Sequence, residues 1–190
     1  MTRVAALLTT VLLLGACSTA DHNDADVAFA TDMIEHHAQA IQMANFTIGR
    51  EGVDPRIADL AEEIRIGQTR EIDTMSQWLR DWGEPVPETG FATGDSHSHS
   101  DDPMESGGDD HSGMPGMMAA DEMQALAEAP AGRFDALWIR MMVEHHQGAI
   151  AMAQEVQDDG SAAKVTDLAA DIESAQAAED KDLQRWLNAV

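Results

Sequence analysis

Two copies of one short segment constrain the fold of this chain more than any other feature of its sequence. The segment Met33–Ala44 carries two adjacent histidines between methionines, and it recurs 109 residues later as Met142–Ala153. In both copies, apolar residues return every three or four positions, which is the spacing of one face of an α-helix. The pattern therefore predicts two equivalent helices, each with a histidine pair near its middle.

Four long helices are predicted from the apolar periodicity and from the Gly, Pro and Asp residues that interrupt it. Their ranges are Val27–Gly49, Pro55–Trp82, Ala131–Val156 and Ser161–Leu187. No pattern typical of β-strands occurs. Because neither pair of helices could bury its apolar face alone, an all-α fold is expected. Two repeated helical hairpins, residues 27–83 and 121–190, would close into one ferritin-like four-helix bundle. On the first helix the apolar face is predicted to reach Ile48, with Gln39 on the opposite face.

The charge of the chain is strongly acidic, with 35 Asp and Glu residues against 11 Lys and Arg. This balance excludes the basic face that nucleic-acid binding requires, and it fits a protein that attracts cations. Most of these carboxylates are expected only to solvate helix faces and a linker.

The first residues have the composition of an export signal. The apolar run Val4–Leu14 is too short to span a membrane, and Leu14–Cys17 matches a lipobox. Residues 1–16 are therefore predicted to be a lipoprotein signal peptide, with lipid on Cys17 and a tether over residues 17–26. Cys17 is the only cysteine, which excludes an intramolecular disulfide. The mature protein is expected outside the cytoplasm, in the cell envelope or periplasm, and attached to the membrane only through its lipid. A plain secreted protein with an incidental cysteine is the alternative.

A low-complexity stretch, residues 84–120, separates the two predicted hairpins. It is rich in Gly, Ser, Asp, His and Met, and a disordered linker is expected through most of it. Its histidines either only keep the linker soluble or collect metal loosely. These histidines are His97, His99 and His111. Within the motif Met114–Met118 at the end of the linker, Met117 and Met118 are expected to fold back toward the core.

The two histidines of a pair cannot share one direction, because adjacent residues on a helix point about 100° apart. His37 falls near the centre of the apolar face, whereas His36 falls at its edge, beside Met33 and Met43. The second copy repeats this arrangement, and its equivalent residues are His146, His145, Met142 and Met152. A lone histidine on such a face is usually a hydrogen-bonded core residue, but equivalent pairs in a repeat favour a shared site.

Two glutamates occupy positions within otherwise apolar helical faces. Glu71 and Glu179 each follow a glutamine, Gln68 or Gln176, by one turn. A buried carboxylate without a partner is strongly destabilising, so each is expected to contact a histidine of another helix. Two interpretations are open: a structural Glu–His pair, or a metal ion held by His and Glu from facing helices, with the glutamines orienting the carboxylates.

The methionines give a further indication of function. Thioether together with imidazole suits monovalent copper, and silver by the same chemistry, whereas Mg²⁺ and Ca²⁺ need oxygen ligands. The candidate metal ligands are His36, His37, His145, His146, Met33, Met43, Met142, Met152, Glu71, Glu179, Met114, Met117 and Met118. No motif indicates nucleophilic catalysis or phosphate binding, and no catalytic residue is assigned.

These motifs resemble the family known as domain of unknown function 305. The resemblance rests on both histidine segments, on Met114–Met118, on Phe134-Asp135, and on the helices that contain Glu71 and Glu179. It covers the chain from about Asp24 onward. The two copies differ at one methionine, because Leu183 stands where the first copy has Met75. The resemblance implies a ferritin-like helical bundle, an exported or lipid-anchored location and, for some members, copper binding. It implies no established enzymatic activity.

The sequence leads to one main hypothesis and two alternatives. The main hypothesis is an extracytoplasmic lipoprotein that binds copper as Cu(I), or Cu(II) or Ag(I), and buffers it, sequesters it or delivers it to a metallochaperone or exporter. The first alternative is a di-metal carboxylate oxidoreductase that uses iron or manganese. Its ligands would be His37, His146, Glu71 and Glu179. The Glu-x-x-His spacing of such sites is absent, because Ile34 stands three residues before His37. The second alternative is a metal-free envelope scaffold in which Glu–His pairs only stabilise the bundle.

Overall fold

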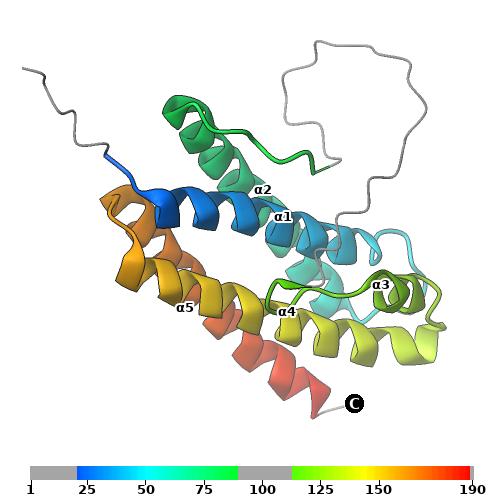
Figure 1. Cartoon of the computed structure of the whole chain (residues 1–190). Coiled ribbons are helices and arrows are strands. Elements are labelled where there is room, and N and C mark those ends of the chain that lie inside the picture. Colours follow the sequence, from blue (N-terminus) through cyan, green and yellow to red (C-terminus); the bar gives the residue numbers. More distant parts are fainter. Residues whose placement is uncertain (1–20, 90–112, 189–190) are drawn as a thin grey trace, which may run out of the picture.

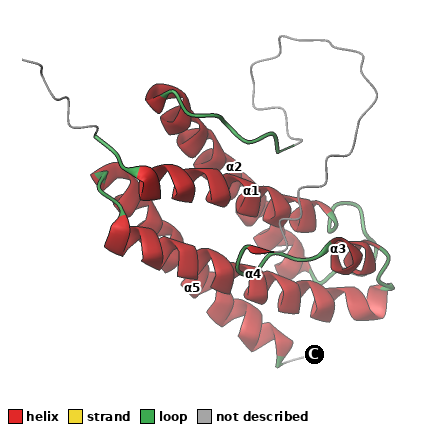
Figure 2. Ribbon diagram, viewed as in Figure 1, coloured by secondary structure: helices red, strands yellow, loops and turns green. Residues whose placement is uncertain are grey.

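The computed structural model describes residues 21–89 and 113–188, and this part of the chain is helical (Figure 1). Its helices are α1 (Asp24–Asn45), α2 (Pro55–Trp82), α3 (Ala120–Ala127), α4 (Ala131–Asp159) and α5 (Ala163–Leu187). No strand occurs in the described residues (Figure 2). The predicted signal peptide, the lipidation site Cys17 and the three linker histidines lie outside these residues, so they stay predictions.

The four long helices form two hairpins that close into one bundle. Helix α1 packs along α2 and α4 packs along α5, while the hairpins meet mainly through α1 and α4. These two helices run antiparallel, since the Asn23 side chain at the start of α1 donates a hydrogen bond to the Asp159 carbonyl at the end of α4, at 2.9 Å. The all-α bundle predicted from the sequence is confirmed. None of the helices in the described residues is long and apolar enough to cross a membrane.

The apolar core consists of two clusters along the bundle. One contains Phe134 and Trp138, and the other contains Phe29 and Ile34. Trp138 is fully buried, and its indole N–H donates to the carbonyl of Met43 at 2.9 Å, so no polar atom of this side chain is left without a partner in the core. On α4 the histidine pair lies between the residues of one cluster and those of the other, and on α1 it lies where the second cluster gives way to the first, although Ile41 still belongs to the second.

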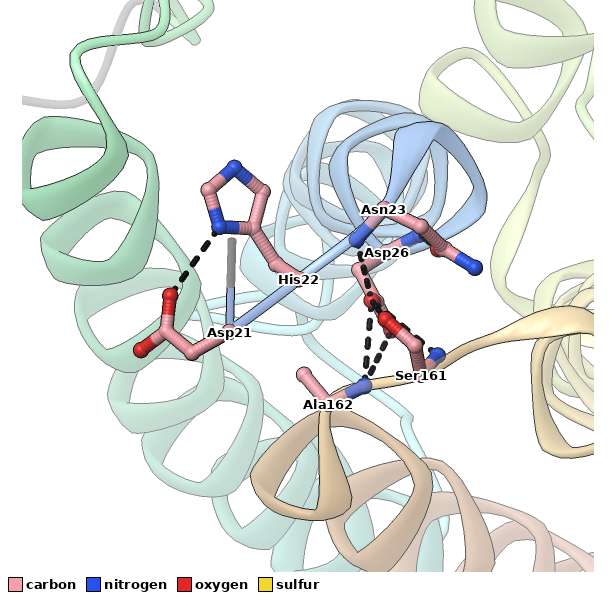
Figure 3. A network of polar contacts seen from close by, with 6 residues as sticks. All are labelled: Asp21, His22, Asn23, Asp26, Ser161 and Ala162. Atoms are coloured by element: carbon pink, nitrogen blue, oxygen red, sulfur yellow. Dashed lines mark hydrogen bonds and ion pairs between the residues drawn. The ribbon is translucent and has the colours of Figure 1, made fainter. Parts of the chain in front are cut away.

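Asp26 joins the first hairpin to the second at one end of the bundle. Its carboxylate accepts from the backbone N–H of Asn23 at 2.8 Å, and Asn23 in turn caps α1 by accepting from the N–H of Asp26 at 3.0 Å. The same carboxylate accepts from the N–H and hydroxyl of Ser161 and from the N–H of Ala162, at 3.0–3.1 Å (Figure 3). This capping box starts α1 at Asp24, three residues before the predicted Val27, and shortens the predicted tether.

The structure departs from the sequence predictions at two further places. Ile48 is 68% exposed, because α1 ends at Asn45 and Ile48 lies in the turn that follows. Between the predicted linker and the third predicted helix, which was expected to start at Ala131, the structure has the additional helix α3, which buries Met123 and Leu126. A helix of this length is marginal alone, so tertiary contacts must stabilise it. Arg50 supplies some of them by donating to the carbonyls of Ala127 and Ala129.

Candidate metal centre

Helices α1 and α4 bring one histidine of each pair face to face. The rings of His36 and His145 have centroids 3.7 Å apart and planes inclined by 40°. Both residues are fully buried. We call them the seam histidines, because they lie where the two hairpins meet. Neighbouring residues on a helix point about 100° apart, so only one histidine of each pair can point toward the other hairpin.

The seam histidines have few hydrogen bonds for buried polar groups. His36 Nε2 lies 3.1 Å from the carbonyl oxygen of Pro115, and since a carbonyl only accepts, this nitrogen carries the proton. His36 Nδ1 and both ring nitrogens of His145 have no hydrogen bond of normal geometry. Most buried polar atoms in proteins do have a partner, so three such nitrogens side by side are unusual.

Burial keeps the seam histidines in their neutral form. It lowers the pKa of His36 to about 3, and repulsion from His37 adds to the shift, while the Pro115 carbonyl opposes it. Burial also lowers the pKa of His145 well below its usual value, with repulsion from His36 and His146 adding to the effect. A neutral imidazole is the form that ligates metals. With Nε2 protonated, His36 therefore presents the lone pair of Nδ1.

The other two histidines, His37 and His146, bind carboxylates of their own hairpins, and we call them the hairpin histidines. His37 Nε2 lies 2.6 Å from Glu71 on α2. His146 lies between two carboxylates of α5, with Nδ1 3.0 Å from Asp180 and Nε2 3.4 Å from Glu179. The expected contacts between Glu and His are thus present, as direct pairs. Burial raises the pKa of Glu179, although the neighbouring His146 opposes this shift.

Asp180 was not predicted to take part in this site. It is only 7% exposed, and it follows Gln176 by four residues and precedes Leu183 by three, which is the spacing of the buried face of α5. That spacing was the available signal. The sequence prediction assigned only the adjacent Glu179, whose position in the second copy matches that of Glu71 in the first. Ile72 occupies the equivalent position on α2, so only the second hairpin has this additional carboxylate.

Two methionines share the helical faces that carry the seam histidines. Met33 and Met142 are fully buried and lie three residues before His36 and His145, a spacing that puts them on the same helical face. The other predicted methionine ligands differ in burial. Met43 and Met118 are buried, whereas Met114, Met117 and Met152 are partly exposed. Met152 lines a pocket with Phe29 and Val156 at the α1–α4 surface.

The segment Met114–Met118, which we call the strap, crosses the seam histidines and contacts both hairpins. Besides the Pro115 carbonyl on His36, the backbone of Met118 makes two hydrogen bonds with the side chain of Gln39. The Gln39 amide donates to the Met118 carbonyl at 2.9 Å and accepts from the Met118 N–H at 2.7 Å. Gln39, which was predicted to lie on the face opposite the apolar one, is therefore covered, because the strap lies over that side of α1.

The donor chemistry of this region favours soft rather than hard cations. Within the described residues, no three His, Cys, Asp or Glu side chains are grouped so that they could hold a metal ion. Glu71, Glu179 and Asp180 are already hydrogen-bonded or ion-paired to the hairpin histidines. What remains near the seam is neutral imidazole nitrogen and thioether sulfur, a set that suits Cu(I) and Ag(I).

Comparison with known proteins places the chain in a family. The model described as "Domain of unknown function (DUF305)" matches residues 26–187. The chain belongs to the DUF305 family. No match is found among curated proteins.

Solved DUF305 structures share this fold. A DUF305 fragment from Deinococcus radiodurans is 27% identical, with a TM-score of 0.71, over 88% of this chain and 98% of that one. A DUF305 protein from Streptomyces coelicolor that is classed as secreted is 28% identical, with a TM-score of 0.70, over 87% of this chain and 93% of the other. The protein CopM in its Cu(II)-bound form is 30% identical, with a TM-score of 0.66, over 86% of this chain and 96% of CopM. CopM has also been solved in Cu(I)-bound and Ag-bound forms.

Proposed function

We propose that this protein binds copper outside the cytoplasm, at the seam histidines and the methionines around them. The observation that carries the proposal is the contact between two fully buried imidazoles, His36 and His145, with three ring nitrogens that have no hydrogen bond of normal geometry. An unsatisfied buried polar atom costs about 1–3 kcal/mol. A bound metal ion removes that cost for two of these nitrogens, one lone pair from each ring, and neutral imidazoles need not lose a proton first.

The ligand type favours monovalent copper. Met33 and Met142 flank the seam on the two helices, and together with imidazole they form a soft ligand set. CopM, which shares the fold at 29–30% identity, has been solved with Cu(I), Cu(II) and Ag. That similarity supports copper as the natural metal and Ag(I) as its chemical analogue, with Cu(II) bound more weakly because it prefers tetragonal nitrogen and oxygen ligands.

Features elsewhere in the chain support a location and a role for the protein. The lipobox at Leu14–Cys17 supports a lipid anchor in the cell envelope, and the secreted Streptomyces relative supports export. The excess of carboxylates raises the local concentration of cations around the protein. The role that fits these features is sequestration, buffering or delivery of copper, with a metallochaperone or exporter as the receiving partner.

The di-metal oxidoreductase is disfavoured by the contacts of the hairpin histidines. Glu71 bonds His37 directly at 2.6 Å, and His146 contacts Glu179 and Asp180, so an iron or manganese ion would have to break these pairs. Elemental analysis of protein purified from its native envelope separates the two proposals. Copper in the purified protein supports ours, and iron or manganese with oxygen-dependent turnover would replace it.

The decisive experiment compares two double variants. His36→Gln with His145→Gln removes the seam ligands, whereas His37→Gln with His146→Gln changes the hairpin histidines. In a Cu(I) titration against a competing chelator, we expect the seam variant to lose at least about 100-fold in affinity, at the upper end of losses seen when a ligand environment is disrupted. The hairpin variant is expected to lose less than about 10-fold.

A thermal melt with and without Cu(I) provides the second measurement. A ligand that binds only the native state raises the melting temperature. The wild-type protein and the hairpin variant are expected to show this increase and the seam variant to lack it. Wild-type affinity in the seam variant would overturn the proposal. A melting temperature of the wild type that copper does not change would favour the metal-free scaffold instead.

A further inference from the structure

The strap can lie across the seam only because two residues beneath and within it are glycines. Gly148 is in the middle of α4, and a Cβ atom there would lie 1.9 Å from the Pro115 carbonyl oxygen and 2.8 Å from the Cα of Gly116. Gly116 itself has φ of +76°, and a Cβ on it would lie 2.7 Å from the carbonyl oxygen of Glu144. The backbone of the strap thus touches the backbone of α4, a close approach that only glycine permits.

Helix α1 contacts the strap in a different way from α4. It uses the long side chain of Gln39, whereas α4 has no side chain at Gly148. Gln39 lies 109 residues before Gly148, the same interval that separates the two histidine segments. Its amide bonds both the N–H and the carbonyl of Met118, as a neighbouring β-strand would. Gly148 therefore lets the strap approach α4, and Gln39 fastens it to α1.

The strap fixes the tautomer of His36 through the carbonyl oxygen of Pro115. The Pro115 carbonyl accepts from His36 Nε2 at 3.1 Å, which leaves Nδ1 as the lone-pair nitrogen. Histidines that bind metals usually donate their other N–H to a carbonyl or carboxylate in this way, and the contact fixes both the tautomer and the ring orientation. No carboxylate hydrogen-bonds His36 in the described part of the chain, so the strap supplies the partner that fixes its tautomer.

We propose that Gln39 and Gly148 are positioning residues for the metal centre: they hold the strap so that Pro115 fixes the tautomer of His36, and the closed strap selects Cu(I) over Cu(II). This inference rests on the proposed copper function and names how the same site is controlled. The selection arises because the strap backbone covers the seam, with the Pro115 carbonyl on His36 and Gly116 against α4. Cu(I) is satisfied by few soft ligands, whereas Cu(II) needs further nitrogen or oxygen ligands, commonly water, which the closed strap keeps out.

The first experiment uses the metal-free protein and so does not depend on copper binding. In Gly148→Ala the new methyl group cannot coexist with the Pro115 carbonyl in its present position, while alanine favours the helix itself. Nitrogen-15 NMR of the imidazoles reports which ring nitrogen is protonated. We expect a single Nε2–H tautomer for His36 in the wild type and a mixture of tautomers in Gly148→Ala. A single, unchanged tautomer in a folded Gly148→Ala would overturn the proposal.

Gly67→Ala is the matched control. Gly67 also lies within a long helix, but apart from the adjoining backbone of that helix nothing lies within 4 Å of the position its Cβ would take. This variant therefore makes the same chemical change without touching the strap, and the His36 tautomer is expected to be that of the wild type. A tautomer change in Gly67→Ala as large as that in Gly148→Ala would mean that helix stability, and not the strap, controls His36.

The second experiment measures metal selectivity. Gln39→Ala removes both hydrogen bonds to Met118 without adding bulk, and Gln42→Ala, at an exposed position of the same helix, is its control. In chelator competition, Gln39→Ala and Gly148→Ala are expected to lose about 10–100-fold in Cu(I) affinity. We expect Cu(II) affinity to change less than about 3-fold, since Cu(II) gains the water ligands that it prefers. Equal losses for both ions, or none for Cu(I), would overturn the proposed selection.

The two proposals can fail separately. If the seam double variant binds Cu(I) like the wild type, the proposed function fails whatever the strap does. If the seam variant loses Cu(I) but the strap variants keep both their tautomer and their selectivity, the copper site stands and the strap is only part of the fold.

Discussion

His36 and His37 are neighbours in the sequence, yet they lie in opposite chemical environments. The ring of His37 bonds the Glu71 carboxylate at 2.6 Å within its own hairpin. The ring of His36 instead faces His145 of the other hairpin and meets only a backbone carbonyl. A rotation of about 100° around the helix axis thus separates a histidine paired with a carboxylate from one held neutral by burial. The same difference recurs between His146 and His145.

This comparison shows why the dipeptide is used as a unit. A hairpin histidine with its carboxylate stabilises the packing of α1 on α2, or of α4 on α5. The seam histidine on the same helix is left with nitrogen lone pairs at the interface of the hairpins. The two hairpins also differ from each other, because His146 has two carboxylate partners and His37 has one.

The largest expected effect comes from breaking the hairpin pairs. His146→Ala leaves the buried Asp180 without its partner, and losing one member of a buried ion pair costs about 3–5 kcal/mol, so we expect a loss of about 4 kcal/mol in the free energy of unfolding. His37→Ala leaves Glu71, whose side chain is 26% exposed and can be hydrated, so the expected loss is about 2 kcal/mol.

Urea unfolding of the metal-free protein at pH 7.5 measures both values. Both variants replace a histidine by alanine, so each serves as the control of the other. A His37→Ala variant that is destabilised as much as His146→Ala would show that the second carboxylate adds nothing.

Acid should destabilise the protein through the seam histidines. The pKa of His36 is about 3 in the folded protein and 6.5 in the unfolded chain, so the unfolded chain binds the proton first as the pH falls. The contribution of neutral His36 to the free energy of unfolding is fully present above pH 6.5. Below that pH the free energy of unfolding declines by about 1.4 kcal/mol per pH unit, so this group accounts for a loss of about 2 kcal/mol at pH 5. The lowered pKa of His145 acts in the same direction.

His36→Gln tests this prediction, because glutamine does not titrate. Its unfolding free energy is expected to fall less between pH 7.5 and pH 5 than that of the wild type, by about 2 kcal/mol. The raised pKa of Glu179 opposes the effect in both proteins, since its folded form takes up a proton more readily than the unfolded chain, and it cancels in the difference. Parallel pH profiles of the two proteins would contradict the assignment of His36 as a buried neutral base.

The smallest expected effect distinguishes the two hairpins. Asp180→Asn keeps an acceptor 3.0 Å from His146 Nδ1 but removes its charge. Hydrogen bonds to charged groups are roughly twice as strong as neutral ones, so a loss of about 1 kcal/mol is expected. Asp171→Asn, at an exposed position of the same helix, is the control and should stay within about 0.5 kcal/mol of the wild type. An effect no larger than the control would mean that Glu179 alone is the partner of His146.

Several features of the site could be predicted from the sequence because they depend on one helix at a time. The 3.6-residue period separates His36 from His37, places Met33 beside His36, and marks Glu71 as a carboxylate on an apolar face. Each statement requires only the residues of a single helix. The pairing of glutamate with histidine then follows from the free energy of leaving a buried charge alone. These predictions agree with the contacts in the structure.

What the sequence could not determine depends on segments that are far apart in the chain. The face of α1 that carries Gln39 is polar, so its period predicts exposure, and only the position of the strap shows that it is covered. The spacing of Asp180 marks it as a carboxylate on the buried face of α5, but only the fold shows that its partner is His146, 3.0 Å away. The short helix α3 needs Arg50 and the core beneath it, because eight residues alone are only marginally helical.

The sequence by itself therefore determined the four long helices, the separation of each histidine pair and the imidazole and thioether character of the candidate ligands, since these follow from local periodicity and side-chain type. The tertiary structure alone decided that His36 faces His145, and that a glycine at position 148 lets the strap reach them. The physical reason is that periodicity fixes directions around one helix axis, whereas the contacts between helices and a crossing loop depend on how distant segments pack together.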